Sequence, residues 1–130
     1  MAAPLGRVVA CVAAGAVLGA LLRYGLSLAL PADPERWPWG IFLANVIGAL
    51  AMGVFLGRIE VIDRVPPYVT AFVATGFLGG LTTFSTFADE AVTGVRAGVP
   101  GLALAYTVVT VLVGWVAVRV GWSLTVRLAR

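Results

Sequence analysis

The stretch GGLTTFSTF, from Gly79 to Phe87, places two glycines, four hydroxyl side chains and two phenylalanines inside an uncharged run from Pro66 to Ala88. Adjacent glycines are poor helix formers and the hydroxyls offer the backbone alternative hydrogen bonds, so the pattern predicts a break in a helix. The run is long enough to cross a bilayer, where irregular backbone persists only inside protein or beside a cavity. A cation bound by the released carbonyls would satisfy them, so the stretch predicts a cation site made of main-chain oxygen.

The two phenylalanines point to chemistry for an anion. Phe84 and Phe87 are three residues apart, so on a helix that resumes after the break their rings would face the same side. Two core aromatics would have the same spacing, but these two alternate with the hydroxyls of Ser85 and Thr86. The edge of an aromatic ring carries partial positive charge. Ring edges and hydroxyls could therefore replace part of the water shell of a small anion, without a fixed charge that would hold it too tightly.

Further polar side chains lie within other apolar runs. Asn45 is the only carboxamide in the sequence, and it either ties two helices together or contributes to a site for a solute. Tyr106 and Thr110 are four residues apart and share one helix face, which suggests a polar track. Arg23, near the end of the first run, is either a structural anchor or a charge that attracts an anion to a vestibule.

Missing residue types exclude several kinds of function. The chain has no His and one Cys, Cys11, so one chain cannot form a Ser-His-Asp triad, a Cys-His pair or a His/Cys metal cluster. All nine basic residues are Arg, and they are scattered at the ends of apolar segments rather than gathered into a patch. We therefore expect neither an enzyme nor a nucleic-acid-binding protein.

Four apolar segments must position these residues. With 130 residues, 61% of them hydrophobic and 12% charged, and a mean hydropathy of +1.02, the chain is expected to be an all-α integral membrane protein with a single domain over residues 1–130. The predicted spans are 8–30, 37–56, 66–88, broken near its centre, and 99–118 or slightly longer. The first run also resembles a signal peptide, but it continues past Arg23 without a clear A-x-A cleavage site.

The arginines indicate how the spans are oriented. An even number of spans places both termini on one side, where most arginines are found: Arg7, Arg58, Arg64, Arg127 and Arg130, with Arg119 leaning the same way, against Arg23, Arg36 and Arg96 on the other side. This modest excess favours cytoplasmic termini. Small residues spaced four apart, such as Gly15 and Gly19, predict close helix packing within the chain or between copies.

Taken together, these motifs resemble the CrcB/Fluc family of fluoride channels. The resemblance rests on GALLRYG at 19–25, NVIGALAMG at 45–53, GGLTTFSTFADE at 79–90, and Tyr106 with Thr110. It implies a four-helix subunit that pairs head to tail in an antiparallel, dual-topology dimer with two fluoride pathways and a central structural sodium ion that is not transported. The residues implied for the sodium site are Gly79 and Thr82, through their main-chain carbonyls. Those implied for the fluoride pathway are Asn45, Phe84, Ser85, Thr86, Phe87, Tyr106 and Thr110, with Arg23 and Glu90 as accessory positions.

The function implied by the resemblance is passive export of fluoride through the plasma membrane of a prokaryote, which lowers its concentration in the cytoplasm. The partner of the chain would be a second copy or an oppositely oriented paralogue, surrounded by membrane lipid. One alternative is a small proton-coupled multidrug transporter, but that function needs a carboxylate within the membrane, and all six acids are expected at span ends or in loops. A second alternative is an assembly subunit that transports nothing.

Overall fold

The computed structural model describes residues 4–62 and 64–129. Within these residues, four helical segments are long and apolar enough to cross a membrane. The first two are α1 (Leu5–Ala29) and α2 (Trp39–Val61). The third is composite, and consists of α3 (Pro67–Thr70), the π-helix η1 (Ala71–Leu78), α4 (Gly79–Leu81) and α5 (Phe84–Arg96), and the fourth is α6 (Pro100–Leu128). The chain is therefore a multi-pass membrane protein, as its composition predicts.

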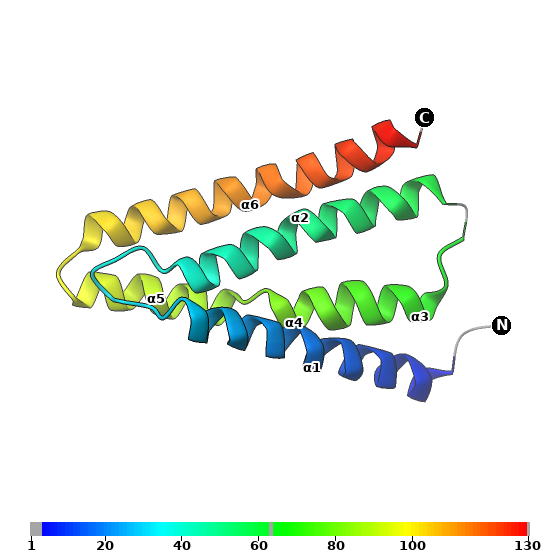
Figure 1. Cartoon of the computed structure of the whole chain (residues 1–130), viewed down its shortest axis with the longest axis horizontal. Coiled ribbons are helices and arrows are strands. Elements are labelled where there is room, and N and C mark those ends of the chain that lie inside the picture. Colours follow the sequence, from blue (N-terminus) through cyan, green and yellow to red (C-terminus); the bar gives the residue numbers. More distant parts are fainter. Residues whose placement is uncertain (1–3, 63, 130) are drawn as a thin grey trace.

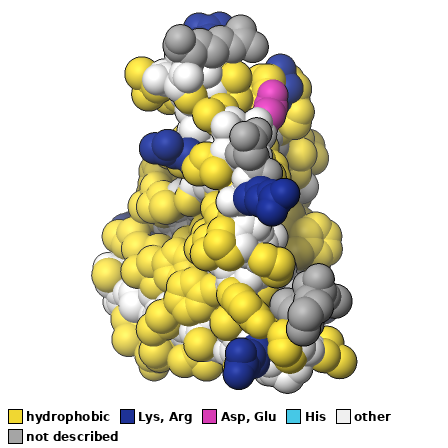
Figure 2. Space-filling model, turned by 90° about the vertical axis from the view of Figure 1, so that its right-hand side faces the viewer, with side chains coloured by type: hydrophobic (Ala, Val, Ile, Leu, Met, Phe, Trp, Pro, Cys, Tyr) yellow, Lys and Arg dark blue, Asp and Glu magenta, His cyan; other side chains and the backbone are white. Residues whose placement is uncertain are grey.

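The helices form two neighbouring pairs, with α1 beside the composite third span and α2 beside α6 (Figure 1). The start of α1 and the end of α6 lie at the same end of the bundle, as an even number of spans requires. Arginines are spaced around this end with apolar side chains between them (Figure 2). Arg130, which the sequence analysis counted there, lies outside the described residues.

Glycines allow both helix pairs to approach closely. A Cβ atom added to Gly19 would overlap the backbone of Phe77, and one added to Gly53 would overlap the backbone of Val118. Gly80 likewise faces the backbone of Ala16 with no room for a side chain. Because these contacts join helices of one chain, the small residues spaced four apart serve packing within the subunit.

The helices extend beyond the bounds that hydropathy predicted. The fourth span, predicted to end at 118 or slightly later, continues to Leu128, and the second continues to Val61 rather than to 56. The connection expected from Asp89 to Gly98 is helical as far as Arg96, so Glu90 belongs to the third span and is half-buried there. The expectation that every acid lies at a span end or in a loop is therefore wrong for Asp89 and Glu90. Hydropathy marks the apolar part of a helix, whereas the helix itself continues through polar turns.

The third span is interrupted at two threonines. Thr82 has φ −82° and ψ 151°, and Thr83 has φ −148° and ψ 128°, both extended conformations between α4 and α5. The glycines before them stay helical, with Gly79 at φ −64° and ψ −33°. The break predicted in this stretch is present, but Gly80 serves the contact with α1 and the threonines form the break itself. The π-helix η1 precedes the break and is separated from it only by α4, and such segments are frequent at functional sites.

Candidate functional site

Asn45 on α2 holds the broken backbone of the third span. Its Nδ2 donates to the Thr83 carbonyl at 3.1 Å, and the Thr83 N–H donates to its Oδ1 at 2.8 Å. Since one backbone group must donate and the other must accept, these two bonds settle which side-chain atom is nitrogen. Asn45 therefore ties two helices together, and the second N–H of its amide stays available to another acceptor.

Thr83 ends the break and begins α5. Its Oγ1 accepts from the Thr86 N–H at 3.3 Å, as the N-cap residue of a helix does. The same oxygen lies 3.2 Å from the hydroxyl oxygens of both Ser85 and Thr86. Thr83 is not among the predicted site residues, although a threonine before a resuming helix is a recognisable N-cap signal.

Because of these contacts, two N–H groups bond to side chains instead of to the carbonyls that they would reach in a continuous helix. The Thr83 N–H, which would bond to the Gly79 carbonyl four residues before it, bonds to Asn45 instead. The Thr86 N–H, which would bond to the Thr82 carbonyl, bonds to Thr83 Oγ1 instead. The diverted carbonyls belong to Gly79 and Thr82, the two residues named for a main-chain cation site.

An open cavity of about 300 Å³ lies beside the break. It is lined by Asn45, Thr82, Thr83, Phe84, Phe87, Thr110 and Val111, so its lining contains no charged side chain. The rings of Phe84 and Phe87 are 5.9 Å apart between centroids and tilted by 54°. Phe87 is 7% exposed, whereas Phe84 is 79% exposed. The two phenylalanines therefore share one cavity, as their spacing predicted, but only Phe87 is packed within the subunit.

Of the two polar residues predicted on α6, Thr110 lines this cavity and Tyr106 does not. The Thr110 hydroxyl is buried and, among the described residues, has no hydrogen-bond partner. Tyr106, one turn earlier, is 1% exposed, and its ring lies 5.2 Å from that of Phe87. The Tyr106 hydroxyl donates to Glu90 Oε2 at 2.7 Å. The rings of Phe84, Phe87 and Tyr106 thus form a continuous series from the break toward the connection between α5 and α6.

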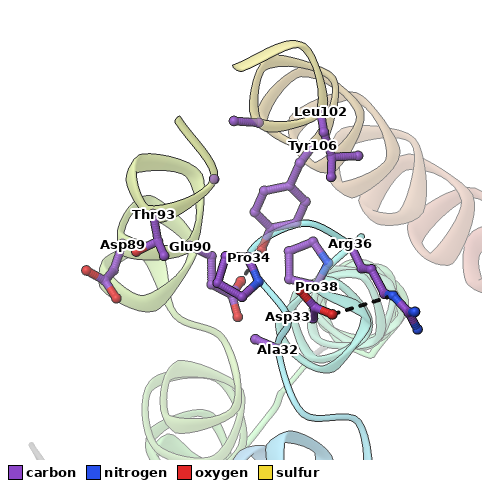
Figure 3. A pocket seen from close by; sticks show the side chains of 12 residues that line it. Ala32, Asp33, Pro34, Arg36, Pro38, Asp89, Glu90, Thr93, Leu102 and Tyr106 are labelled. Atoms are coloured by element: carbon purple, nitrogen blue, oxygen red, sulfur yellow. Dashed lines mark hydrogen bonds and ion pairs between the residues drawn. The ribbon is translucent and has the colours of Figure 1, made fainter. Parts of the chain in front are cut away.

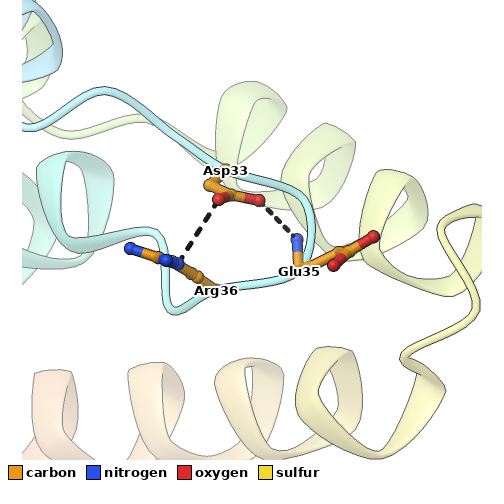
Figure 4. A network of polar contacts seen from close by, with 3 residues as sticks. All are labelled: Asp33, Glu35 and Arg36. Carbon is orange, nitrogen blue, oxygen red and sulfur yellow. Dashed lines mark hydrogen bonds and ion pairs between the residues drawn. The ribbon is translucent and has the colours of Figure 1, made fainter.

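A second cavity, of about 200 Å³, lies at the far end of this series (Figure 3). Tyr106 and Glu90 point into it from α6 and α5, and the segment before α2 closes another side with Asp33 and Arg36. Arg36 Nε lies 3.5 Å from Asp33 Oδ2, while Asp33 Oδ1 accepts from the Glu35 N–H at 2.9 Å (Figure 4). The segment thus carries its own polar network beside the cavity that Glu90 and Tyr106 line.

Arg23 lines neither of these two cavities. It is half-buried on α1, and its Nε donates to the Gly80 carbonyl at 3.2 Å. The contact places Arg23 at the end of α4, next to the diverted carbonyl of Gly79. Of the two interpretations that its position in the sequence left open, the geometry supports a structural anchor.

Comparison with known proteins gives a family for this arrangement. The model of the family described as CrcB-like protein, Camphor Resistance (CrcB), matches residues 10–122. The chain is 45% identical over 124 residues to fluoride-specific ion channel FluC 1 of Mycobacterium bovis, a match that covers 93% of this chain and 92% of the relative. It is also 45% identical over 92 residues to fluoride-specific ion channel FluC of Bordetella pertussis, covering 71% of this chain and 70% of the relative. The chain therefore belongs to the CrcB/FluC family of fluoride-specific ion channels.

Proposed function

We propose that the chain conducts fluoride passively through the cavity beside the break of the third span. The observation that carries this proposal is a cavity lined by available donors and aromatic rings, with no charged side chain in its lining. Asn45 has one amide N–H left after its bond to Thr83, and the buried Thr110 hydroxyl has no partner among the described residues. Such donors can replace part of the hydration shell of a small anion, and the absence of a fixed positive charge allows it to leave.

The aromatic series extends the pathway toward the second cavity. The rings of Phe84, Phe87 and Tyr106 are each tilted by 54° relative to the next ring of the series. Ring edges carry partial positive charge and suit an anion. Ser85 and Thr86 line neither cavity, but their hydroxyls lie at the start of α5 within 3.2 Å of Thr83 Oγ1, and Thr83 lines the cavity beside the break. In this proposal Glu90 keeps an accessory role, because its carboxylate is held by the Tyr106 hydroxyl.

We further propose that the pathway is completed by a second subunit in antiparallel orientation. Phe84 is 79% exposed, and Ser85 next to it is exposed as well. Broken backbone and hydroxyls at membrane depth are tolerated only where protein or a cavity surrounds them, so this face requires a cover other than lipid. A second copy or an oppositely oriented paralogue would supply it. A cysteine-labelling experiment on active protein expressed alone distinguishes them, since labelling from both sides is expected only for a homodimer.

A structural sodium ion at the centre of the dimer would bind the carbonyls that the break leaves without a helical donor. The carbonyls of Gly79 and Thr82 have lost their helical donors to Asn45 and Thr83. Main-chain oxygen is a suitable ligand for such a hard cation, and two carbonyls from each subunit would surround it. The ion would neutralise the negative ends of the half-helices and hold the dimer together without being transported.

Passive export follows from the membrane potential. An inside-negative potential drives an anion outward with ~2.3 kcal/mol per charge per 100 mV, so no ATP site or coupled proton is required. Fluoride enters an acid-exposed cell as neutral hydrogen fluoride and ionises in the less acidic cytoplasm. A channel in the plasma membrane would therefore lower the cytoplasmic fluoride concentration.

The direct test is efflux from liposomes that contain the purified protein, measured with a fluoride electrode and repeated with chloride. Fast loss of fluoride with retention of chloride is expected. Loss of neither ion, from protein that is folded and inserted in both orientations, would refute the proposal and favour an assembly subunit.

Glu90 gives one specific observation in favour of a proton-coupled transporter, because this carboxylate lies within the third span. Coupled transport requires that the carboxylate exchange protons, and such an activity is abolished by Glu90→Gln. The channel proposal predicts that Glu90→Gln still conducts fluoride and that a proton gradient drives no uptake of an organic cation by the unmodified protein. Loss of all transport in Glu90→Gln, together with uptake of an organic cation by the unmodified protein, would favour the transporter.

A further inference from the structure

The carbonyls that end the first half of the third span differ in whether they accept a hydrogen bond. The Leu78 carbonyl accepts from the N–H of Thr82 at 3.0 Å and from its hydroxyl at 2.9 Å. The Gly80 carbonyl accepts from Arg23 Nε at 3.2 Å. The carbonyl between them, that of Gly79, has lost its helical donor to Asn45. A side chain from another helix therefore occupies one acceptor beside the proposed cation site.

Close packing of α1 brings Arg23 to this position. Gly19, one turn before Arg23, lies against the backbone of Phe77 and Leu81, so α1 runs directly along the end of α4. Within residues 4–62 and 64–129 the only ion pair joins Asp33 and Arg36, so Arg23 is not held by a carboxylate. Its partner is instead the carbonyl end of a helix, where the helix dipole favours a cation.

We propose that Arg23 is a positioning residue for the cation site. By donating to the Gly80 carbonyl, it orients the last turn of α4 and leaves the carbonyls of Gly79 and Thr82 to face a sodium ion. Arg23 acts in this role through its hydrogen bond and not through its charge, because the positive guanidinium repels a nearby cation. The inference rests on the proposed function only for the cation site, and not for fluoride conduction.

Three substitutions separate the hydrogen bond from the charge. Arg23→Gln removes the charge but keeps an N–H donor, because the amide nitrogen of Gln is as many bonds from Cα as Nε of Arg. Arg23→Lys keeps the charge but replaces the Nε–H by a methylene group and moves the donor one bond further out. Arg23→Met has similar length with neither charge nor donor and serves as the control for both.

The measurement is the sodium concentration that gives half of the maximal thermal stabilisation of the purified dimer, with fluoride efflux recorded on the same preparations. Arg23→Gln should need as little sodium as the unmodified protein or less. Arg23→Lys and Arg23→Met should need about tenfold more, since one hydrogen bond that shapes the site is lost. Elution as a dimer in high sodium shows that each variant is folded.

Three outcomes overturn the inference. If Arg23→Lys behaves as the unmodified protein and Arg23→Gln does not, the charge is what matters. Equal sodium requirements in all variants would show that Arg23 does not shape the site. If sodium does not stabilise the unmodified protein, there is no cation site to position, whereas fluoride efflux in that case leaves the channel proposal standing. Absence of fluoride efflux, with sodium dependence retained, would refute the channel and not the role of Arg23.

Discussion

Replacing Asn45 by leucine or by aspartate separates two roles that the structure gives to this side chain. It holds both backbone groups of Thr83, and it lines the cavity proposed for fluoride. Leucine branches at the same carbon as asparagine, with a larger side chain, and removes both hydrogen bonds. Aspartate keeps an oxygen that can accept from the Thr83 N–H, loses the bond to the Thr83 carbonyl, and adds a negative charge to the cavity.

The expected magnitudes differ in stability and in conduction. An unsatisfied buried polar group costs roughly 1–3 kcal/mol. Asn45→Leu leaves two such groups, the N–H and the carbonyl of Thr83, and the site is half-buried, so the substitution should lower the free energy of unfolding by about 2–4 kcal/mol. Asn45→Asp loses one of the two bonds and should cost roughly half as much. A carboxylate about 4 Å from a fluoride ion repels it by ~4 kcal/mol at an effective dielectric constant of 20, which corresponds to about a thousandfold loss of flux.

The assay compares unfolding in mixed micelles with fluoride efflux from liposomes, both corrected for the amount of dimer. Asn45→Asp should be the more stable of the two variants and should still be blocked. Efflux close to that of the unmodified protein in Asn45→Asp would remove this residue from the anion pathway. An unchanged unfolding free energy in Asn45→Leu would refute the conclusion that its hydrogen bonds hold the break.

Two further pairs of substitutions test the pathway and the packing. Phe84→Ile should strongly reduce fluoride efflux with little change in the stability of the subunit, because this side chain is 79% exposed. Phe87→Ile should also destabilise the subunit by about 1–3 kcal/mol, since Phe87 is in the core. Normal efflux in Phe84→Ile would exclude its ring from the mechanism. Gly19→Ala should reduce the folded fraction in detergent, because the added methyl group meets the backbone of Phe77 in η1 and of Leu81 in α4. Gly25→Ala, in open space on the same helix, should be neutral or stabilising by up to about 1 kcal/mol. Equal stability of these two alanine variants would contradict the packing derived for α1.

The sequence contained enough local information to predict much of the architecture. Apolar runs of membrane length predicted the four spans, and Gly79–Phe87 predicted that the third span is interrupted. Small residues spaced four apart, such as Gly15 and Gly19, predicted close contact between helices. These features depend on composition and on neighbours along the chain, so a pattern along one segment is sufficient to reveal them.

The ends of the helices were less predictable. Hydropathy ended the third span before Asp89, and the structure continues it to Arg96, which places Glu90 in a helix and brings it to Tyr106. A charged residue ends an apolar run but does not end a helix, because backbone hydrogen bonds continue where the helix meets the membrane surface. The role of Glu90 beside Tyr106 therefore could not be derived from the pattern of charges.

Sequence alone determined which residue types the site contains, and the tertiary structure decided what each of them contacts. Asn45 was recognised as a costly amide in a membrane helix, but its two bonds to Thr83 depend on how α2 lies against the break. Arg23 was recognised as a charge too deep for a loop, and its bond to Gly80 depends on the close approach of α1 to α4. Such pairings join residues far apart in the chain, and they arise from the packing of whole helices, which no local pattern specifies.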